Sequence, residues 1–214
     1  MIEITRWTRP DLVDLLSRLG LCSDMVPDAL GVAEHVHGAQ RRDGGGPYLE
    51  EHVYPVTATV ATYLSRVDPA EGADTVLITI LHDTIEDSLT VTERSLTTLF
   101  GGSIASGVVT LSKPSKHGGK SNGAAEEEEE RYVDQIAHSA FPLRVVKVFD
   151  RLNNLAAVHH RPLEKRQVYL AETGAYYLDL ARGVDESLAV QMTELLRAQH
   201  KRLDQQSAGS RHLS

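Results

Sequence analysis

The 214-residue chain has one cysteine, no apolar run of the roughly 18 residues that a transmembrane helix needs, and no excess of basic side chains. The single Cys22 excludes an internal disulfide and any zinc site built from several cysteines. With 22 Lys and Arg against 30 Asp and Glu, the formal net charge is -8, which argues against nucleic-acid or membrane-surface binding. The start, MIEITRWTRPDL, lacks the basic-then-apolar order of a secretory signal. We therefore expect a cytoplasmic protein with no nucleic-acid or membrane partner.

The composition that remains is that of an ordinary soluble protein. Apolar residues make up 41% of the chain and charged residues 24%, and the length suits one domain with a full core. Strict alternation of apolar and polar residues is weak throughout, so we expect an all-α fold. Within that single domain we expect an N-terminal helical extension over 1–25, a main unit over 26–185, and a C-terminal helix with a flexible tail over 186–214.

Apolar residues at helical spacing and the Gly and Pro residues between them divide the chain into elements. The pattern predicts helices over 11–19, 26–40, 52–66, 73–87, 163–181 and 186–202, with a short helix after Thr92 that ends at Phe100. Residues 41–47 and 114–124 are predicted to be loops, and 205–214 a disordered tail. The apolar run 143–150 suits a buried strand or a buried helix equally. The acidic run 126–130 is typical of a solvated helix face.

The segment LHDTIED, residues 81–87, has the greatest concentration of ionisable groups. On a helix His82 and Glu86 lie one turn apart, and so do Asp83 and Asp87. Three carboxylates this close to an apolar helix repel each other and resist desolvation. A divalent cation held by His82 and Asp83 would offset that repulsion. An exposed helix end with solvated charges is the alternative.

A metal site needs ligands from several elements, because one helix cannot surround an ion. The sequence offers His37, His52 and Asp150 as further candidates. His52 stands at the start of a predicted helix. Asp150 ends an apolar run, where a buried carboxylate needs a partner, and Asn154 follows one turn later. Each of these residues alone is more often structural, so only their combination indicates a site.

Several short motifs, read in chain order, carry a family resemblance. They are HGAQRR (37–42), GGPY (45–48) followed by His52, LHDTIED (81–87), LFG (99–101), LSK (111–113), FDRLNNL (149–155), and Glu172-Thr173 with Tyr177. In this order they resemble the motifs of the HD-domain alarmone hydrolases of the Rel/SpoT type. The resemblance implies a helical bundle with a central metal site, with the HD phosphohydrolase domain over 26–185. No synthetase motif follows, so the chain looks like the small stand-alone, metazoan SpoT-homologue type.

The resemblance also implies roles for individual residues. One divalent ion, by analogy manganese, would be held by His52, His82, Asp83 and Asp150; zinc and iron accept similar ligands. Glu86 and Asp87 would orient or deprotonate the water that attacks the 3′-pyrophosphate of a purine nucleotide such as ppGpp. The substrate would be bound by Arg42, Tyr48, Lys113, Asn154 and Tyr177. His37 would support the site from outside the ligand set.

Three positions depart from the family pattern. Ala156 and Ala157 stand where relatives carry Arg and then Thr or Asp, and Asp43 adds a negative charge beside Arg42. The departures favour, as one alternative, another purine nucleotide such as an adenine alarmone or a biosynthetic nucleotide phosphate. A second alternative is a hydrolase-type antitoxin whose acidic run meets a basic toxin, a small alarmone synthetase. A third is a structural HD protein without activity. A homodimer is compatible with each of these.

Overall fold

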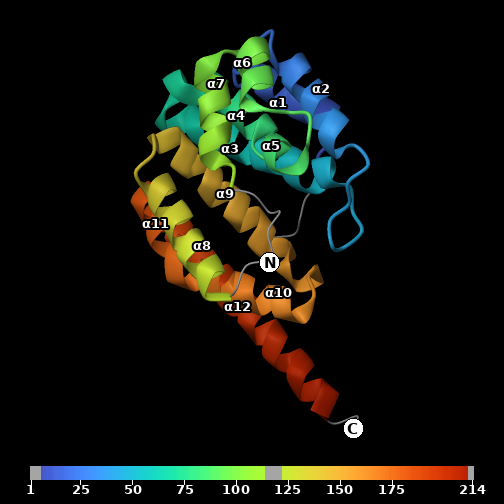
Figure 1. Cartoon of the computed structure of the whole chain (residues 1–214), viewed down its shortest axis with the longest axis vertical. Coiled ribbons are helices and arrows are strands. Elements are labelled where there is room, and N and C mark those ends of the chain that lie inside the picture. The colour runs from blue at the N-terminus through green and yellow to red at the C-terminus, as the bar shows by residue number, and fades with distance from the viewer. Residues whose placement is uncertain (1–5, 114–121, 212–214) are drawn as a thin grey trace.

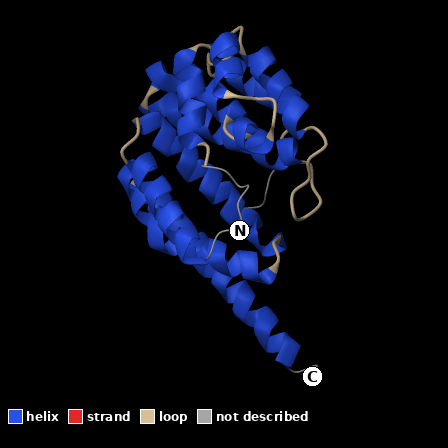
Figure 2. Cartoon of the chain, in the orientation of Figure 1, coloured by secondary structure: helices blue, strands red, loops and turns tan. Residues whose placement is uncertain are grey.

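The computed structural model describes residues 6–113 and 122–211, and within these ranges the chain forms helices and no strand (Figure 2). The helices are α1 (Arg9–Arg18), α2 (Val26–His37), α3 (Tyr54–Val67), α4 (Gly72–Leu81), α5 (Thr84–Asp87), α6 (Glu93–Phe100), α7 (Gly102–Leu111), α8 (Asn122–Ala137), α9 (Phe141–Ala157), α10 (Leu163–Glu172), α11 (Leu178–Val184) and α12 (Glu186–Arg211). The expected all-α class is confirmed. None of the described helices is long and apolar enough to cross a membrane.

Helix α9 is the central element of the bundle. It packs against α3, α4 and α7 on one side and against α8, α11 and α12 on the other, as Figure 1 shows. The run 143–150 is therefore helical, which decides between the strand and the helix that its sequence allowed. Val145, Val148, Leu152 and Leu155 are buried between the two groups of helices. The C-terminal part of α12 extends away from the body (Figure 1).

Some element boundaries agree with those predicted from the sequence and others do not. Thr92 caps α6 as predicted, because its hydroxyl accepts from the backbone N–H of Ser95 at 3.2 Å. Helix α2 ends at His37 and not at residue 40. Residues 122–124 belong to α8 and not to the predicted loop, whose remainder lies outside the described residues. The disordered tail was also predicted too early, since α12 continues to Arg211.

The predicted continuous helix over 73–87 is wrong, because the chain turns at His82 and Asp83 between α4 and α5. Two side chains bond to carbonyl groups at this turn. His82 Nδ1 lies 2.7 Å from the carbonyl oxygen of Thr79, and the Thr84 hydroxyl donates to the carbonyl of Leu81 at 2.7 Å. In a regular helix neighbouring side chains point about 100° apart. The turn instead directs His82 and Asp83 to one point.

Two other predicted helices contain a π-helical turn. Residues Leu49–Val53 form one such turn before α3, and Thr173–Tyr177 form the other between α10 and α11. A π turn places an extra residue in the helix and occurs often at functional sites. His52 lies in the first turn and Tyr177 in the second, so each turn carries a residue that the sequence assigned to the site.

Candidate active site

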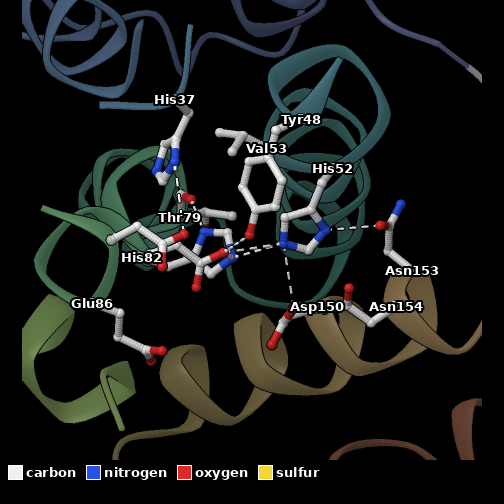
Figure 3. Close-up of polar contacts among 12 residues, drawn as sticks. His37, Tyr48, His52, Val53, Thr79, His82, Glu86, Asp150, Asn153 and Asn154 are labelled. Carbon is white, nitrogen blue, oxygen red and sulfur yellow. Dashed lines mark hydrogen bonds and ion pairs between the residues drawn. The ribbon is translucent and has the colours of Figure 1, made fainter. Parts of the chain in front are cut away.

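Four side chains from three parts of the fold converge at the centre of the molecule (Figure 3). His52 Nε2 lies 3.3 Å from His82 Nε2, 3.3 Å from Asp83 Oδ2 and 3.5 Å from Asp150 Oδ1. His82 Nε2 lies 3.1 Å from Asp83 Oδ2. His52, His82 and Asp83 form a group whose ligand atoms could share one metal ion. The structure thus brings together the four residues that the sequence assigned to a metal.

The tautomer of His52 is set by Asn153. Arg42 carries only donors, and its Nη1 lies 2.6 Å from Asn153 Oδ1, so this atom of the amide is the oxygen. The same oxygen lies 2.8 Å from His52 Nδ1. Nδ1 must therefore carry the hydrogen, and the Nε2 of a neutral His52 presents its lone pair to the centre of the site.

The tautomer of His82 is set in the same way. Its Nδ1 faces the carbonyl oxygen of Thr79, which can only accept, so the Nε2 of a neutral His82 also presents a lone pair. Two imidazole lone pairs then face each other at 3.3 Å, next to the carboxylates of Asp83 and Asp150. This donor set, with hydrogen-bonded second nitrogens, fits a divalent cation.

The electrostatic potential at the site is strongly negative. Burial alone would lower the pKa of His82, but the carboxylates of Asp83 and Asp150 outweigh it and raise the pKa to about 9. Burial likewise opposes ionisation of Asp150, yet Lys147 and His52 lower its pKa to about 2. Lys147 Nζ lies 2.9 Å from Asp150 Oδ2. Without a metal the site attracts a proton, and a cation would compete for that place.

Glu86 and Asp87, the predicted catalytic carboxylates, are held from different sides. The backbone N–H of Lys113 donates to Glu86 Oε1 at 2.7 Å. Gln40 Nε2 donates to Asp87 Oδ2 at 3.1 Å, while Gln40 Oε1 lies 2.6 Å from His37 Nδ1. His37 is buried, and within the described residues its Nε2 has no hydrogen-bond partner. It lies outside the ligand group and orients Gln40, which agrees with a supporting role.

A cavity of about 1010 Å³ opens beside these residues. Its walls include Asp83, Glu86, Asp87 and Asp150, together with all five predicted substrate-binding residues: Arg42, Tyr48, Lys113, Asn154 and Tyr177. A cavity of this size accommodates a nucleotide-sized ligand. The site is therefore a pocket whose wall includes two of the candidate metal ligands, Asp83 and Asp150, while His52 and His82 are buried next to them.

Three of the predicted substrate-binding residues already have protein partners near the metal ligands. Arg42 donates to Asn153 and, at 2.9 Å, to Asn154 Oδ1. Asn154 Nδ2 in turn donates to Asp150 at 2.6 Å, and the Tyr48 hydroxyl donates to Asp83 at 2.5 Å. Their contact with substrate stays a prediction, but each also orients a candidate metal ligand.

The other two predicted substrate-binding residues meet at Glu129. Lys113 Nζ lies 2.5 Å from Glu129 Oε2, and the buried Tyr177 hydroxyl donates to Glu129 Oε1 at 2.7 Å. Glu129 is only 6% exposed, so the expectation of a solvated acidic run fails for this member. The lysine and tyrosine lower its pKa against the opposing effect of burial. Glu129 thereby anchors α8 to the wall of the cavity.

The positions that depart from the family pattern differ in their surroundings. Asp43 lies on the cavity wall 3.7 Å from Arg161 Nε, so its charge faces a cation. Ala157 also lines the cavity and contributes only a methyl group. Ala156 is buried, and its carbonyl accepts from Gln199. Of the two alanines, Ala157 is therefore the one placed to affect a ligand.

Sequence reasoning missed five residues around the site: Gln40, Glu129, Lys147, Asn153 and Arg161. A lysine inside an apolar run, three residues before Asp150, was a usable signal for Lys147. Gln40 and Asn153 stood inside recognised motifs without an assigned role. Nothing in the sequence distinguishes Glu129 from its four acidic neighbours or marks Arg161.

Comparison with known proteins identifies a family and a shared fold. Residues 29–208 match the family model described as an HD domain. A Myxococcus xanthus protein named GTP pyrophosphokinase is 35% identical over 74% of this chain and 20% of its own length. An Aquifex aeolicus protein named guanosine-3′,5′-bis(diphosphate) 3′-pyrophosphohydrolase is 31% identical over 80% of this chain and 23% of its own length. The chain thus spans about a fifth of the length of these curated relatives.

A solved structure has the same fold. It was described under the heading of a metazoan ortholog of SpoT that hydrolyses ppGpp, and it superposes with a TM-score of 0.64 at 21% identity. The match covers 83% of this chain and 96% of the other. The domain boundaries expected from the sequence, 1–25, 26–185 and 186–214, stay predictions.

Proposed function

The chain belongs to the HD-domain family, and on that basis we propose that it is a metal-dependent hydrolase that releases pyrophosphate from the 3′ position of a purine nucleotide such as ppGpp. The observation that carries the proposal is the pair of imidazoles whose Nδ1 atoms are both tied to acceptors. Their Nε2 lone pairs and two carboxylates then face one point on a cavity wall. The name of the Aquifex relative supports the choice of reaction.

The donor set also supports a choice of metal. Two imidazoles and two carboxylates combine nitrogen and oxygen ligands, a set without thiolates that manganese accepts and that zinc and iron also accept. A bound divalent ion would supply Lewis-acid chemistry, polarising a phosphoryl oxygen and lowering the pKa of a nearby water. His52, His82, Asp83 and Asp150 would hold it.

The residues around the candidate metal ligands would accept the proton, orient the water, keep a ligand ionised and contact the nucleotide. The backbone N–H of Lys113 donates to one oxygen of Glu86 and so orients its carboxylate. The Glu86 carboxylate would accept the proton of an attacking water. Asp87 is oriented by Gln40 and would hold that water in place. Lys147 keeps Asp150 ionised as a ligand, since its ammonium lies 2.9 Å from the carboxylate. Arg42 and Asn154 would contact the base and sugar from the cavity wall.

The test is a panel of nucleotides incubated with manganese-loaded protein. We expect pyrophosphate release from ppGpp and from other nucleoside 3′-diphosphates, none in chelator, and a rate lower by roughly 10²–10⁴ with Glu86→Gln. Release of pyrophosphate only from 5′-triphosphates, or no turnover of any nucleotide, would overturn the proposal.

A second candidate is a phosphohydrolase that acts on a purine nucleotide with fewer phosphates than ppGpp. The observation that favours it is Ala157, which leaves one part of the cavity wall without a polar group. The same panel separates the two candidates, because a 3′- or 2′-monophosphate preferred over ppGpp by tenfold or more in kcat/KM would favour the second.

A further inference from the structure

Two segments far apart in the sequence meet at the mouth of the cavity. One is the glycine loop, which we define as residues 41–47. The other is the turn between α9 and α10, which contains His160 and Arg161. Asp43 Oδ2 lies 3.7 Å from Arg161 Nε, and a Cβ added at Gly44 would lie 3.0 Å from His160 Cγ. The loop backbone therefore rests on the His160 ring, with one loose ion pair beside it.

The glycine loop has a defined shape. The backbone N–H of Arg42 donates to Gly46 at 2.9 Å, and that of Gly45 donates to Arg42 at 2.7 Å. Gly45 has a φ of 82°, in the left-handed region that favours glycine. The loop therefore presents Asp43 to Arg161 from a fixed backbone.

Arg161 is held by an aromatic ring. Its guanidinium carbon lies 4.3 Å from the centre of the Tyr169 ring, and that of Arg151 lies 3.5 Å from the same centre. Stacking of this kind orients the guanidinium plane and limits its motion.

Three other cations that line the cavity have closer partners. Lys147 is paired with Asp150 at 2.9 Å, and Lys113 with Glu129 at 2.5 Å. Arg151 donates to Thr173 at 2.9 Å and to the carbonyl of Tyr169 at 2.8 Å. Arg161 differs from them, because its one carboxylate partner is half exposed and lies beyond hydrogen-bonding distance. Within the described residues its Nη atoms donate no hydrogen bond.

Resting on the proposed function, we propose that Arg161 is the specificity-determining residue that binds the non-scissile 5′-phosphates of the nucleotide, and that Asp43 occupies Arg161 until those phosphates displace it. A terminal phosphate carries more charge than a carboxylate and can accept two parallel N–H bonds from a guanidinium. A nucleotide without 5′-phosphates cannot displace Asp43 and gains nothing from Arg161. Arg161 therefore adds a preference for nucleotides that carry 5′-phosphates over those that lack them.

Arg161→Ala tests the claim when two substrates are compared. We expect kcat/KM for ppGpp to fall ten- to hundredfold, and kcat/KM for guanosine 3′-diphosphate, which lacks the 5′-phosphates, to stay within about twofold. Arg161→Lys should recover part of the loss. An equal loss on both substrates, or no loss on ppGpp, would overturn the inference.

Asp43→Asn distinguishes two roles for Asp43: competing with phosphate for Arg161, or holding the glycine loop in place through the ion pair. If Asp43 competes with phosphate, its neutralisation should raise kcat/KM for ppGpp about two- to fivefold through a lower KM, most clearly at low salt. If the ion pair only holds the loop in place, Asp43→Asn and Arg161→Ala should both lower activity. Changes of the same sign in both variants would therefore contradict the proposal.

A matched control and a binding measurement separate this inference from the proposed function. Arg182→Ala removes an arginine that pairs with the surface carboxylates Asp179 and Glu186 outside the cavity and should leave both substrates unaffected. If no nucleotide is hydrolysed, the proposed function fails and calorimetric binding decides the inference. Affinity for guanosine 5′-diphosphate should then fall at least tenfold in Arg161→Ala while affinity for guanosine 3′-monophosphate is unchanged. Equal effects on the two ligands would overturn it.

Discussion

The two ends of the cavity are built differently. At the inner end His52, His82 and Asp150 are almost fully buried, and each is held by a bond of 2.6 to 2.9 Å to Asn153, Thr79, Asn154 or Lys147. At the mouth Asp43 is 50% exposed, Arg161 is 28% exposed, and they are 3.7 Å apart. The same cavity thus joins a buried cluster with short hydrogen bonds to a loosely paired rim.

This difference between the two ends indicates where amino-acid substitutions are tolerated. A buried charge that loses its partner destabilises the structure strongly, so the inner end can vary little. An exposed ion pair contributes about 0 to 1 kcal/mol, so the rim can vary without loss of the fold. We infer that the inner end determines the chemistry and the rim determines which nucleotide is accepted.

The largest expected effect is a loss of activity at the inner end, and two variants distinguish a metal ligand from the proton acceptor there. Asp83→Ala should remove both bound metal and activity, because it removes a carboxylate that adjoins both imidazoles. Glu86→Gln should lower kcat by roughly 10²–10⁴ and keep the metal, because only the proton acceptor changes. Metal content by atomic emission and single-turnover kinetics measure the two effects. Equal metal loss in both variants would contradict this division of roles.

The next effect concerns pH and tests whether the inner end exchanges a proton for a metal. In metal-free protein His82 has a pKa of about 9 against an ordinary 6.5. Its stabilisation of the fold is therefore complete below pH 6.5 and is lost as the pH rises through 9, by up to about 3 kcal/mol. Asp150 does not interfere, because its stabilisation is present above its ordinary pKa of 3.8 and is lost only as the pH falls through about 2.

Thermal unfolding at pH 6 and pH 8.5 measures this exchange. The Tm of chelator-treated protein should fall between the two values, and the increase in Tm caused by Mn²⁺ should be larger at pH 8.5. A Tm that is flat with pH, together with an equal Mn²⁺ effect at both values, would show that the buried cluster does not bind the proton.

A smaller effect is expected from the residue that orients His52. Asn153→Ala removes the acceptor for His52 Nδ1 and should weaken metal binding about 10- to 100-fold, the usual cost of losing such a partner. Asn153→Asp is the matched control, since a carboxylate still accepts from the ring and from Arg42. Metal titration of both variants is the measurement. If the two variants bind metal equally weakly, the amide nitrogen and not its oxygen is the important group.

The smallest effect lies at the rim and sharpens the comparison. Ala157 leaves one part of the cavity wall without a polar side chain, so we expect unmodified protein to hydrolyse ppGpp with a kcat/KM below about 10⁵ M⁻¹s⁻¹. Ala157→Thr should raise that value severalfold by adding a hydroxyl to the wall. Ala156→Thr is the control, because this buried residue does not line the cavity and the change should lower Tm without raising activity. A value above 10⁵ for unmodified protein would show that the departures from the family pattern are harmless.

Much of the inner end could be predicted from the sequence. The helical class follows from apolar spacing, and His52, His82, Asp83 and Asp150 stand in ordered motifs that can be recognised without coordinates. The predicted helix over 73–87 was wrong because side-chain bonds from His82 and Thr84 to backbone carbonyls end α4. Spacing of apolar residues carries no information about such local competition for carbonyl groups.

By itself the sequence determined an acidic, all-α chain with a histidine and carboxylate cluster, because residue type and local periodicity suffice for those conclusions. Only the tertiary structure decided the tautomer of His52, which depends on Asn153 101 residues away. It likewise decided which of five glutamates is buried and that Asp43 faces Arg161. These pairings arise from the packing of α8 and α9 and of the glycine loop against distant segments. A distance between residues far apart in the chain is set by the whole core and not by their neighbours in sequence.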